Sequence, residues 1–331
     1  MDLAMKNKYL IRMEEPEDCL IVSDNGDIYY RMFLDPVTKL LKNEFDCMQF
    51  HTPSSKPIEY HEHDQGSETF FVTQGKFLCC CMGRGFYMGP GDILHIQPWM
   101  GHGFVPAEPE SRLNILFTGM DQQVITQNWK RLLECYPGVY EDLAFKGKFR
   151  EFNGSVTSRT LPAPSEVPKE QIQQLRPAGT CLRSHSFDGI DLRLKVARYE
   201  TEGVKEIWDL HMMPGFYCKW DDFLPEFRLF YVKSGKVRCS VKTSSTETLV
   251  FDAMEENIVA IPPYTPFEFE VIEEARMFDM DCAARLQDLC EEIGSLLQSD
   301  PGKAEDKAAL LPLFKEYGFN CTDVGYLQVE V

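Results

Sequence analysis

Three histidines and one glutamate have the residue types and the spacing of a metal site. His61 and His63 stand two residues apart in YHEHDQGSETFF, and on a β-strand that spacing sends both side chains to one face. Glu68 follows after a short turn, and His102 comes late in GDILHIQPWMGHGF. Three imidazoles and one carboxylate suit a divalent ion such as Fe, Mn, Ni or Zn. Four protein ligands on an octahedral ion leave two positions for substrate, water or O₂.

The residues around these four are candidates for a substrate pocket. Glu68 either stays bound to the metal or detaches and serves as a base. The bulky Trp99, three residues before His102, is placed to wall the pocket. The side chains expected to line its mouth or interior are Tyr60, Phe70, Trp99, Phe104 and Arg112.

Short strands are the elements that must position these residues. Runs such as 69–73 (TFFVT) and 229–233 (LFYVK) are aromatic and β-branched, and Gly and Pro turns separate them. Many short strands with such turns are typical of a sandwich or barrel. Helices are expected at 129–136, at 165–175 and at 286–297, and Asp300-Pro301 opens another.

The sequence repeats itself after 160 positions. TFFVTQGK at 69–76 matches LFYVKSGK at 229–236, and GDILHIQPWMGHGF at 91–104 resembles NIVAIPPYTPFEF at 257–269. The chain therefore contains two copies of one β unit, which a partly helical segment joins.

The second copy lacks the ligand set. Phe267 matches His102, and Asp221, Phe223 and Arg228 match His61, His63 and Glu68. Such residues cannot hold a divalent metal. An Asp221–Arg228 pair is expected to be a salt bridge, and a site for a small anion or sugar is the alternative.

The composition restricts the partners and the compartment. The 331 residues are 44% hydrophobic and 26% charged, as in ordinary globular proteins of about two domains. The net charge is −18, without the basic face that nucleic acid requires, and acidic membrane lipids are disfavoured too. No apolar run is long enough to span a membrane. Twelve cysteines without a visible secretory signal indicate a reducing cytoplasm.

The motifs resemble those of the cupin superfamily, and in tandem those of a bicupin. The first cupin motif, G(X)5HXH(X)3–4E(X)6G, is matched by His61, His63, Glu68 and Gly75, with Ser55 in place of the leading Gly. Gly91 and His102 match the second motif, G(X)5PXG(X)2H(X)3N. The chain departs from that motif at three positions, which hold Gln97, Trp99 and Pro106.

The resemblance implies an all-β dominated fold of two tandem cupin jelly-roll barrels, or double-stranded β-helices, with a few linker and C-terminal α-helices. We expect an N-terminal barrel with the metal site at 1–121, a partly helical linker at 122–180, a degenerate barrel at 181–282 and a helical extension at 283–331.

The family implies several kinds of activity, because fold alone does not fix function. We expect a dioxygenase-like oxidoreductase that acts on a small oxygenated substrate chelated to the metal. A metal-dependent isomerase, lyase or decarboxylase is an alternative. A non-catalytic protein that binds a sugar or a small acid is another. The expected partner is a small molecule, and a homodimer is left open.

Other polar and sulfur residues are expected to be structural. His51 and His211 occupy equivalent places in both copies, and His95 is expected to face away from the metal. Cys79, Cys80 and Cys81 follow Gly75 in a strand, where buried cysteine is mostly a small apolar residue.

Overall fold

The computed structural model contains two compact units. Unit 1 comprises residues 1–15, 36–40 and 181–331, and unit 2 comprises residues 16–35 and 41–180. The described residues are 9–12, 19–24, 28–33, 45–50, 58–63, 66–118, 154–158, 163–164, 167–187, 189–201, 203–220, 228–282 and 285–318. The helix expected at 129–136, and His51, Asp221 and Phe223, lie outside them.

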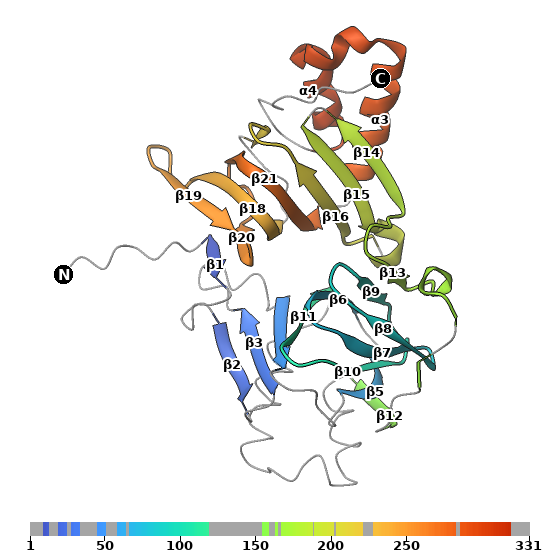
Figure 1. Cartoon of the computed structure of the whole chain (residues 1–331). Helices are drawn as coiled ribbons and strands as arrows, with labels where there is room; N and C mark the ends of the chain where they lie inside the picture. Colours follow the sequence, from blue (N-terminus) through green and yellow to red (C-terminus); the bar gives the residue numbers. More distant parts are fainter. Residues whose placement is uncertain are drawn as a thin grey trace, which may run out of the picture. The chain divides into compact units, whose positions relative to one another are not determined.

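Unit 2, the N-terminal unit, consists of two antiparallel sheets (Figure 1). The first sheet has the order β12-β5-β10-β7-β8, and the second has the order β13-β9-β6-β11-β4-β3-β2. The strands are β2 (Cys19–Asp24), β3 (Ile28–Phe33), β4 (Phe45–Phe50), β5 (Ile58–His63), β6 (Ser67–Gln74), β7 (Phe77–Cys81), β8 (Arg84–Met88), β9 (Ile93–Ile96), β10 (His102–Pro106), β11 (Ser111–Thr118), β12 (Gly154–Ser158) and β13 (Leu175–Arg176).

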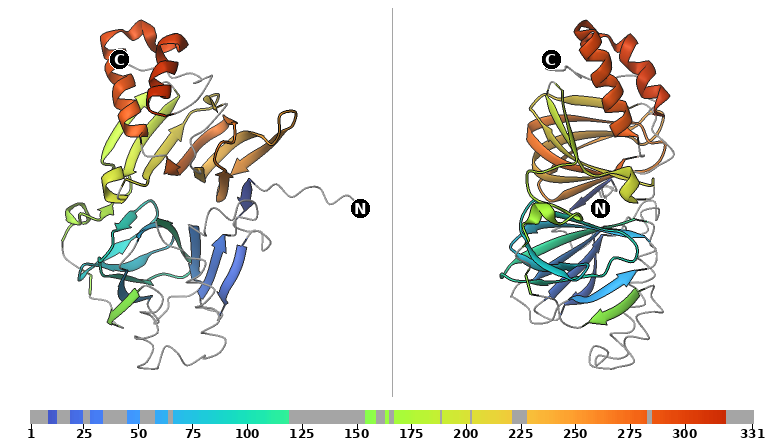
Figure 2. Two further views of the ribbon diagram at one scale, coloured as in Figure 1. Left: turned by 180° about the vertical axis from the view of Figure 1, so that it is seen from behind. Right: turned by 90° about the vertical axis from the view of Figure 1, so that its right-hand side faces the viewer.

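Unit 1, the C-terminal unit, repeats this antiparallel design and adds two helices. Its main sheet path is β1-β20-β18-β21-β16-β15-β14, with β17 on β21 and β19 on β18. The strands are β1 (Leu10–Arg12), β14 (Arg183–Phe187), β15 (Ile190–Val196), β16 (Glu206–Met212), β17 (Tyr217–Trp220), β18 (Arg228–Lys242), β19 (Thr248–Met254), β20 (Asn257–Ile261) and β21 (Phe267–Cys282). Helices α3 (Leu286–Ser299) and α4 (Lys307–Glu316) lie side by side near β14 (Figure 2).

Side-chain alternation along the strands decides which residues form each core. On β11, Leu113, Ile115 and Phe117 point into the N-terminal core, where they meet Phe70 and Phe104. A separate apolar cluster fills the C-terminal unit, and α3 contributes to it with an apolar stripe that recurs at helical spacing. The expected fold class, two mostly β units with few helices, is confirmed.

Two local expectations near the ends of the units need correction. The helix expected at 165–175 is replaced by one turn of 3-10 helix at Lys169–Gln171 and by β13, which pairs with β9. Asp300-Pro301 opens a 3-10 turn at Pro301–Glu305, and α4 begins later, where Asp306 accepts hydrogen bonds from the N–H groups of the first turn. Tertiary pairing overrides local helix propensity at β13.

The two units also depart from the expected domain boundaries. Strand β1 pairs with β20, so the first residues of the chain belong to the C-terminal unit. Strands β12 and β13, which fall in the expected linker, pair with β5 and β9 in the N-terminal unit. Among the described residues, no helix combines the length and the apolar character that crossing a membrane requires.

Candidate metal centre

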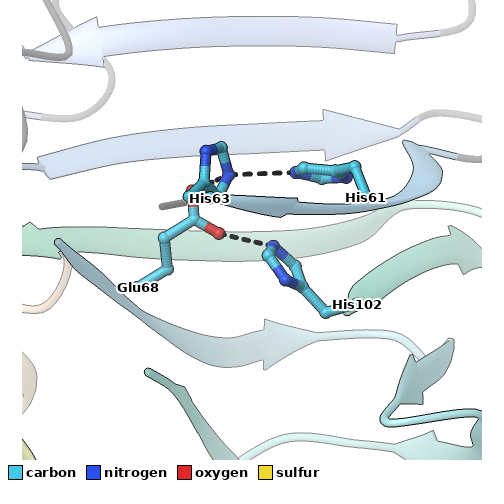
Figure 3. Close-up of side chains that lie close together, drawn as sticks. All are labelled: His61, His63, Glu68 and His102. Atoms are coloured by element: carbon cyan, nitrogen blue, oxygen red, sulfur yellow. Dashed lines mark hydrogen bonds and ion pairs between the residues drawn. The ribbon is translucent and has the colours of Figure 1, made fainter. Parts of the chain in front are cut away.

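Three strands from both sheets of the N-terminal unit bring the four expected ligands together (Figure 3). Strand β5 presents His61 and His63 on one face, as their spacing predicts. Strand β10 begins with His102, which lies opposite His61 in the antiparallel register. Glu68, near the start of β6, reaches the same point from the second sheet.

The four ligand atoms all lie within 4.8 Å of one another. The Nε2 atoms of His61 and His63 are 3.1 Å apart. One carboxylate oxygen of Glu68 lies 2.8 Å from His102 Nε2, and the other lies 3.3 Å from His63 Nε2. All four side chains are nearly enclosed, and His102 is 1% exposed. No second cluster of this kind occurs in the described part of the chain.

These distances fit an ion at the centre of the cluster. Metal–ligand bonds of about 2.1 Å put neighbouring octahedral ligands about 3 Å apart, which matches the measured separations of 2.8 to 3.3 Å. Without an ion, only protons could bridge the Nε2 atoms of His61 and His63. The same holds for His102 Nε2 and the Glu68 carboxylate. A divalent ion satisfies all four lone pairs at once.

The backbone fixes the orientation of His102. Its Nδ1–H donates to the carbonyl oxygen of Met100 at 2.8 Å, so its Nε2 is left to face Glu68 and an ion. Such a bond on the outer nitrogen sets the ring tautomer of a metal-binding histidine. Sequence reasoning missed Met100, because any residue supplies a carbonyl group.

Glu68 supplies negative charge to the centre. Burial by itself raises the pKa of this carboxyl group, but the adjacent His63 and His102 outweigh it and hold the pKa well below the ordinary value. Glu68 is therefore a carboxylate at neutral pH, and it is a weak base in this setting. The carboxylate is the form of this side chain that binds a divalent ion.

The turn at 97–101, between β9 and β10, supports two of the ligands. The N–H of Trp99 donates to the carbonyl of His63 at 2.7 Å, and the N–H of Met82 donates to the carbonyl of Gly101 at 2.8 Å. A Cβ atom on Gly101 would lie 2.4 Å from the hydroxyl oxygen of Tyr60. The close approach of turn and strand therefore depends on glycine at position 101.

The expected pocket residues occupy different places. Phe70 lies beside the centre, with its ring centroid 5.7 Å from that of His102, and Phe104 packs against Phe70. Tyr60 alternates to the opposite face of β5 from the ligands, and its hydroxyl accepts a hydrogen bond from the Gly83 N–H. Trp99 is 65% exposed.

Arg112 lies far from the centre along β11. It is paired with Gln74, whereas Phe117 of the same strand is paired with Glu68. Five residues of strand span about 16 Å, so Arg112 belongs to the other end of the barrel.

The corresponding part of the C-terminal unit holds aromatic residues. Phe267 lies opposite Trp220, as His102 lies opposite His61, so Trp220 and not Asp221 corresponds to His61. Arg228 corresponds to Glu68 at the start of its strand, and it forms a buried ion pair with Asp279 of β21. This pair gives Arg228 a partner inside the described barrel.

The remaining histidines and cysteines have structural surroundings. His95 Nδ1 lies 2.9 Å from the hydroxyl of Thr69, and His211 Nε2 lies 2.7 Å from a carboxylate oxygen of Glu274. Cys79 and Cys81 belong to the N-terminal core. Burial raises the pKa of the Cys81 thiol to about 12, so it stays protonated at neutral pH.

Comparisons with known proteins support the fold. Residues 49–118 match the family described as Cupin domain. No curated protein matches the chain. Solved structures of oxalate decarboxylase from Bacillus subtilis are similar in fold. The enzyme at pH 4.6 has 14% identity and a TM-score of 0.52, over 83% of this chain and 76% of that chain. A structure used to assign the EPR fine-structure parameters of its Mn(II) centres has 15% identity and a TM-score of 0.51, over 83% of this chain and 77% of that chain. The chain thus has a bicupin fold, and its N-terminal barrel contains a domain of the cupin family.

Proposed function

We propose that this protein is a metal-dependent enzyme whose N-terminal barrel binds a small oxygenated substrate at the ion held by His61, His63, Glu68 and His102. The convergence of four ligand atoms within 4.8 Å, in a nearly enclosed position, carries the proposal. Three neutral imidazoles and one carboxylate would leave a divalent ion with net positive charge, which favours substrates that chelate through carboxylate, enolate or hydroxyl oxygens.

The residues of the chain have distinct tasks in this proposal. The Met100 carbonyl holds the Nδ1 proton of His102 and so keeps the ring aimed at the ion. Glu68 contributes charge without taking up a proton at neutral pH. The apolar rings of Phe70 and Phe104 exclude water from one side of the centre. When bound, the metal supplies a Lewis acid with open positions.

For the reaction we propose dioxygenase-like chemistry first. His61, His63, Glu68 and His102 would hold the ion, which would supply a Lewis acid with positions open to the oxygens of the substrate and so prepare the substrate for reaction with O₂. The ion is proposed to be Fe or Mn for this reaction. Ni and Zn are the alternatives for the isomerase and lyase candidates.

A decarboxylase is the second candidate. The similar solved structures are oxalate decarboxylases, one of them studied for its Mn(II) centres. Their likeness to this chain shows the fold alone. We therefore propose decarboxylation as a second reaction class. The two candidates differ in their use of O₂, because decarboxylation releases CO₂ without a net requirement for an oxidant.

The test is to load purified protein with Fe(II) or Mn(II) and to supply aromatic diols, diketones and small dicarboxylates. O₂ uptake and CO₂ release are both measured, for the wild type, for His61→Ala and for the matched control His211→Ala, a histidine of the C-terminal unit. Net O₂ uptake that depends on His61 supports the dioxygenase. Release of CO₂ without net uptake supports the decarboxylase.

Tight binding without turnover, lost in His61→Ala, would support a non-catalytic binding protein instead. Equal behaviour of His61→Ala and the wild type would refute the proposed centre. A cytoplasmic location and a homodimer stay predictions. Light scattering during size-exclusion chromatography tests the dimer.

A further inference from the structure

Trp99 combines two features that packing does not explain. Its side chain is 65% exposed, so the indole contributes little to the core. Its backbone has φ of +66°, a left-handed conformation that is unfavourable for a bulky residue. Glycine or asparagine would adopt this conformation at lower cost. The sequence therefore keeps a large ring in solvent at a position that favours a small residue.

The position of Trp99 links it to the metal centre. Its N–H donates to the carbonyl of His63 at 2.7 Å, and the next residue, Met100, holds His102. His63 ends β5, Glu68 lies near the start of β6 and His102 begins β10. All three ligands therefore lie at strand ends, at the end of the barrel where the turn with Trp99 is.

The C-terminal unit provides an internal comparison. Ile96-Gln-Pro-Trp99 matches Ile261-Pro-Pro-Tyr264 in the repeat. Tyr264 has the same left-handed backbone, with φ of +56°, and is 64% exposed. The barrel below Tyr264 has Trp220 and Phe267 in place of His61 and His102. The two turns thus present similar aromatic side chains, one beside a ligand cluster and one beside an apolar interior.

We infer that Trp99 is a specificity-determining residue whose indole stacks on a flat ring of the substrate. This inference rests on the proposed function, and it narrows the substrate class to planar rings that carry chelating oxygens, such as aromatic diols. A substrate whose oxygens bind the ion would extend its ring toward the turn at 97–101. There the exposed indole of Trp99 offers a flat apolar face. A two-carbon dicarboxylate has no ring to place there.

The test measures binding of two chelators to the Mn(II)-loaded protein by calorimetry. 4-Nitrocatechol has a flat ring, and oxalate has none. The variant Trp99→Asn removes the ring while asparagine keeps the left-handed backbone, and Trp99→Phe keeps an aromatic face. Tyr264→Asn is the matched control in the other unit. Thermal unfolding of each metal-free variant reports whether the turn is intact.

We expect Trp99→Asn to bind 4-nitrocatechol about two- to twelvefold more weakly, and Trp99→Phe to lose less. Oxalate binding should stay at the wild-type value, and Tyr264→Asn should change neither affinity. The unfolding midpoint of Trp99→Asn should equal or exceed that of the wild type.

Four results would overturn the inference. One is an unchanged affinity of Trp99→Asn for 4-nitrocatechol. Another is an equal loss for both chelators, or a large fall in the unfolding midpoint, either of which would assign Trp99 a structural role. If the wild type binds neither chelator, the proposed function itself fails, and the inference fails with it.

Discussion

Replacing Gly101 with alanine should disturb the metal centre through a specific collision with Tyr60. The new Cβ would lie 2.4 Å from the Tyr60 hydroxyl oxygen and 2.6 Å from its ring carbon Cζ. Both distances are well inside van der Waals contact. The ring cannot retreat without cost, because its hydroxyl accepts a hydrogen bond from the Gly83 N–H at 3.0 Å.

The expected cost is about 1–3 kcal/mol, as for other insertions of a methyl group into a filled space. For a unit of 150–250 residues this lowers the unfolding midpoint by about 2–12 °C. Gly101 stands between Met100, which orients His102, and His102 itself. Disturbing such an outer partner typically lowers metal affinity about 10- to 100-fold.

The assay is a double-mutant cycle with Tyr60→Ala, which removes the colliding ring. Thermal unfolding of the metal-free protein and calorimetric binding of Mn(II) are measured for both single variants and the double variant. We expect Gly101→Ala to cost little in the Tyr60→Ala background, so the coupling energy should approach the whole single-variant cost. The control is Gly89→Ala, whose Cβ would meet nothing within 4 Å. Equal costs of Gly101→Ala in both backgrounds would refute the reasoning.

Three further predictions concern other parts of the chain. Asp279→Ala removes the buried carboxylate that forms an ion pair with Arg228, so unfolding by denaturant should show a loss of stability of about 3–5 kcal/mol. Adding Arg228→Met should restore most of this loss, and no recovery would contradict the prediction. Asp92 accepts hydrogen bonds from the Ala178 N–H and from Lys169 Nζ. Asp92→Ala should therefore lower the free energy of unfolding by about 1–3 kcal/mol and make residues 167–180 more sensitive to protease. An unchanged rate of proteolysis would count against this contact. Burial raises the pKa of the Cys81 thiol to about 12, so Cys81 should resist iodoacetamide at pH 8 in the native protein and react after unfolding. Mass spectrometry locates the labelled residue. Rapid labelling of Cys81 in the native protein would contradict its burial.

The ligand cluster was predictable because it depends on local rules. Residues two positions apart on a β-strand have their side chains on the same face. The spacing of His61 and His63 alone therefore predicts that they lie together. The repeat predicted a second barrel, and the match of Phe267 with His102 holds in the strand register. Matching Asp221 with His61 was wrong by one residue, because Trp220 is the residue that pairs with Phe267 in the strand register.

The unit boundaries, strand β13 and the place of Arg112 depend on contacts between distant parts of the chain, which residue types do not encode. Pairing of β1 with β20 brings together residues about 250 positions apart, and no local pattern predicts it. Residues 165–175 have helix-favouring side chains, yet Leu175 pairs with Leu94 of β9. Arg112 was expected near the pocket, but the register of β11 places it at the other end of the strand.

The most direct measurement is a crystal structure of protein purified without added metal, with anomalous data collected across the Mn, Fe, Ni and Zn absorption edges. The account predicts one peak within about 2.0–2.3 Å of the Nε2 atoms of His61, His63 and His102 and of a Glu68 carboxylate oxygen. It predicts no corresponding peak beside Arg228 in the other barrel. An empty cluster after soaking in these metals, or a peak ligated by other residues, would contradict the account.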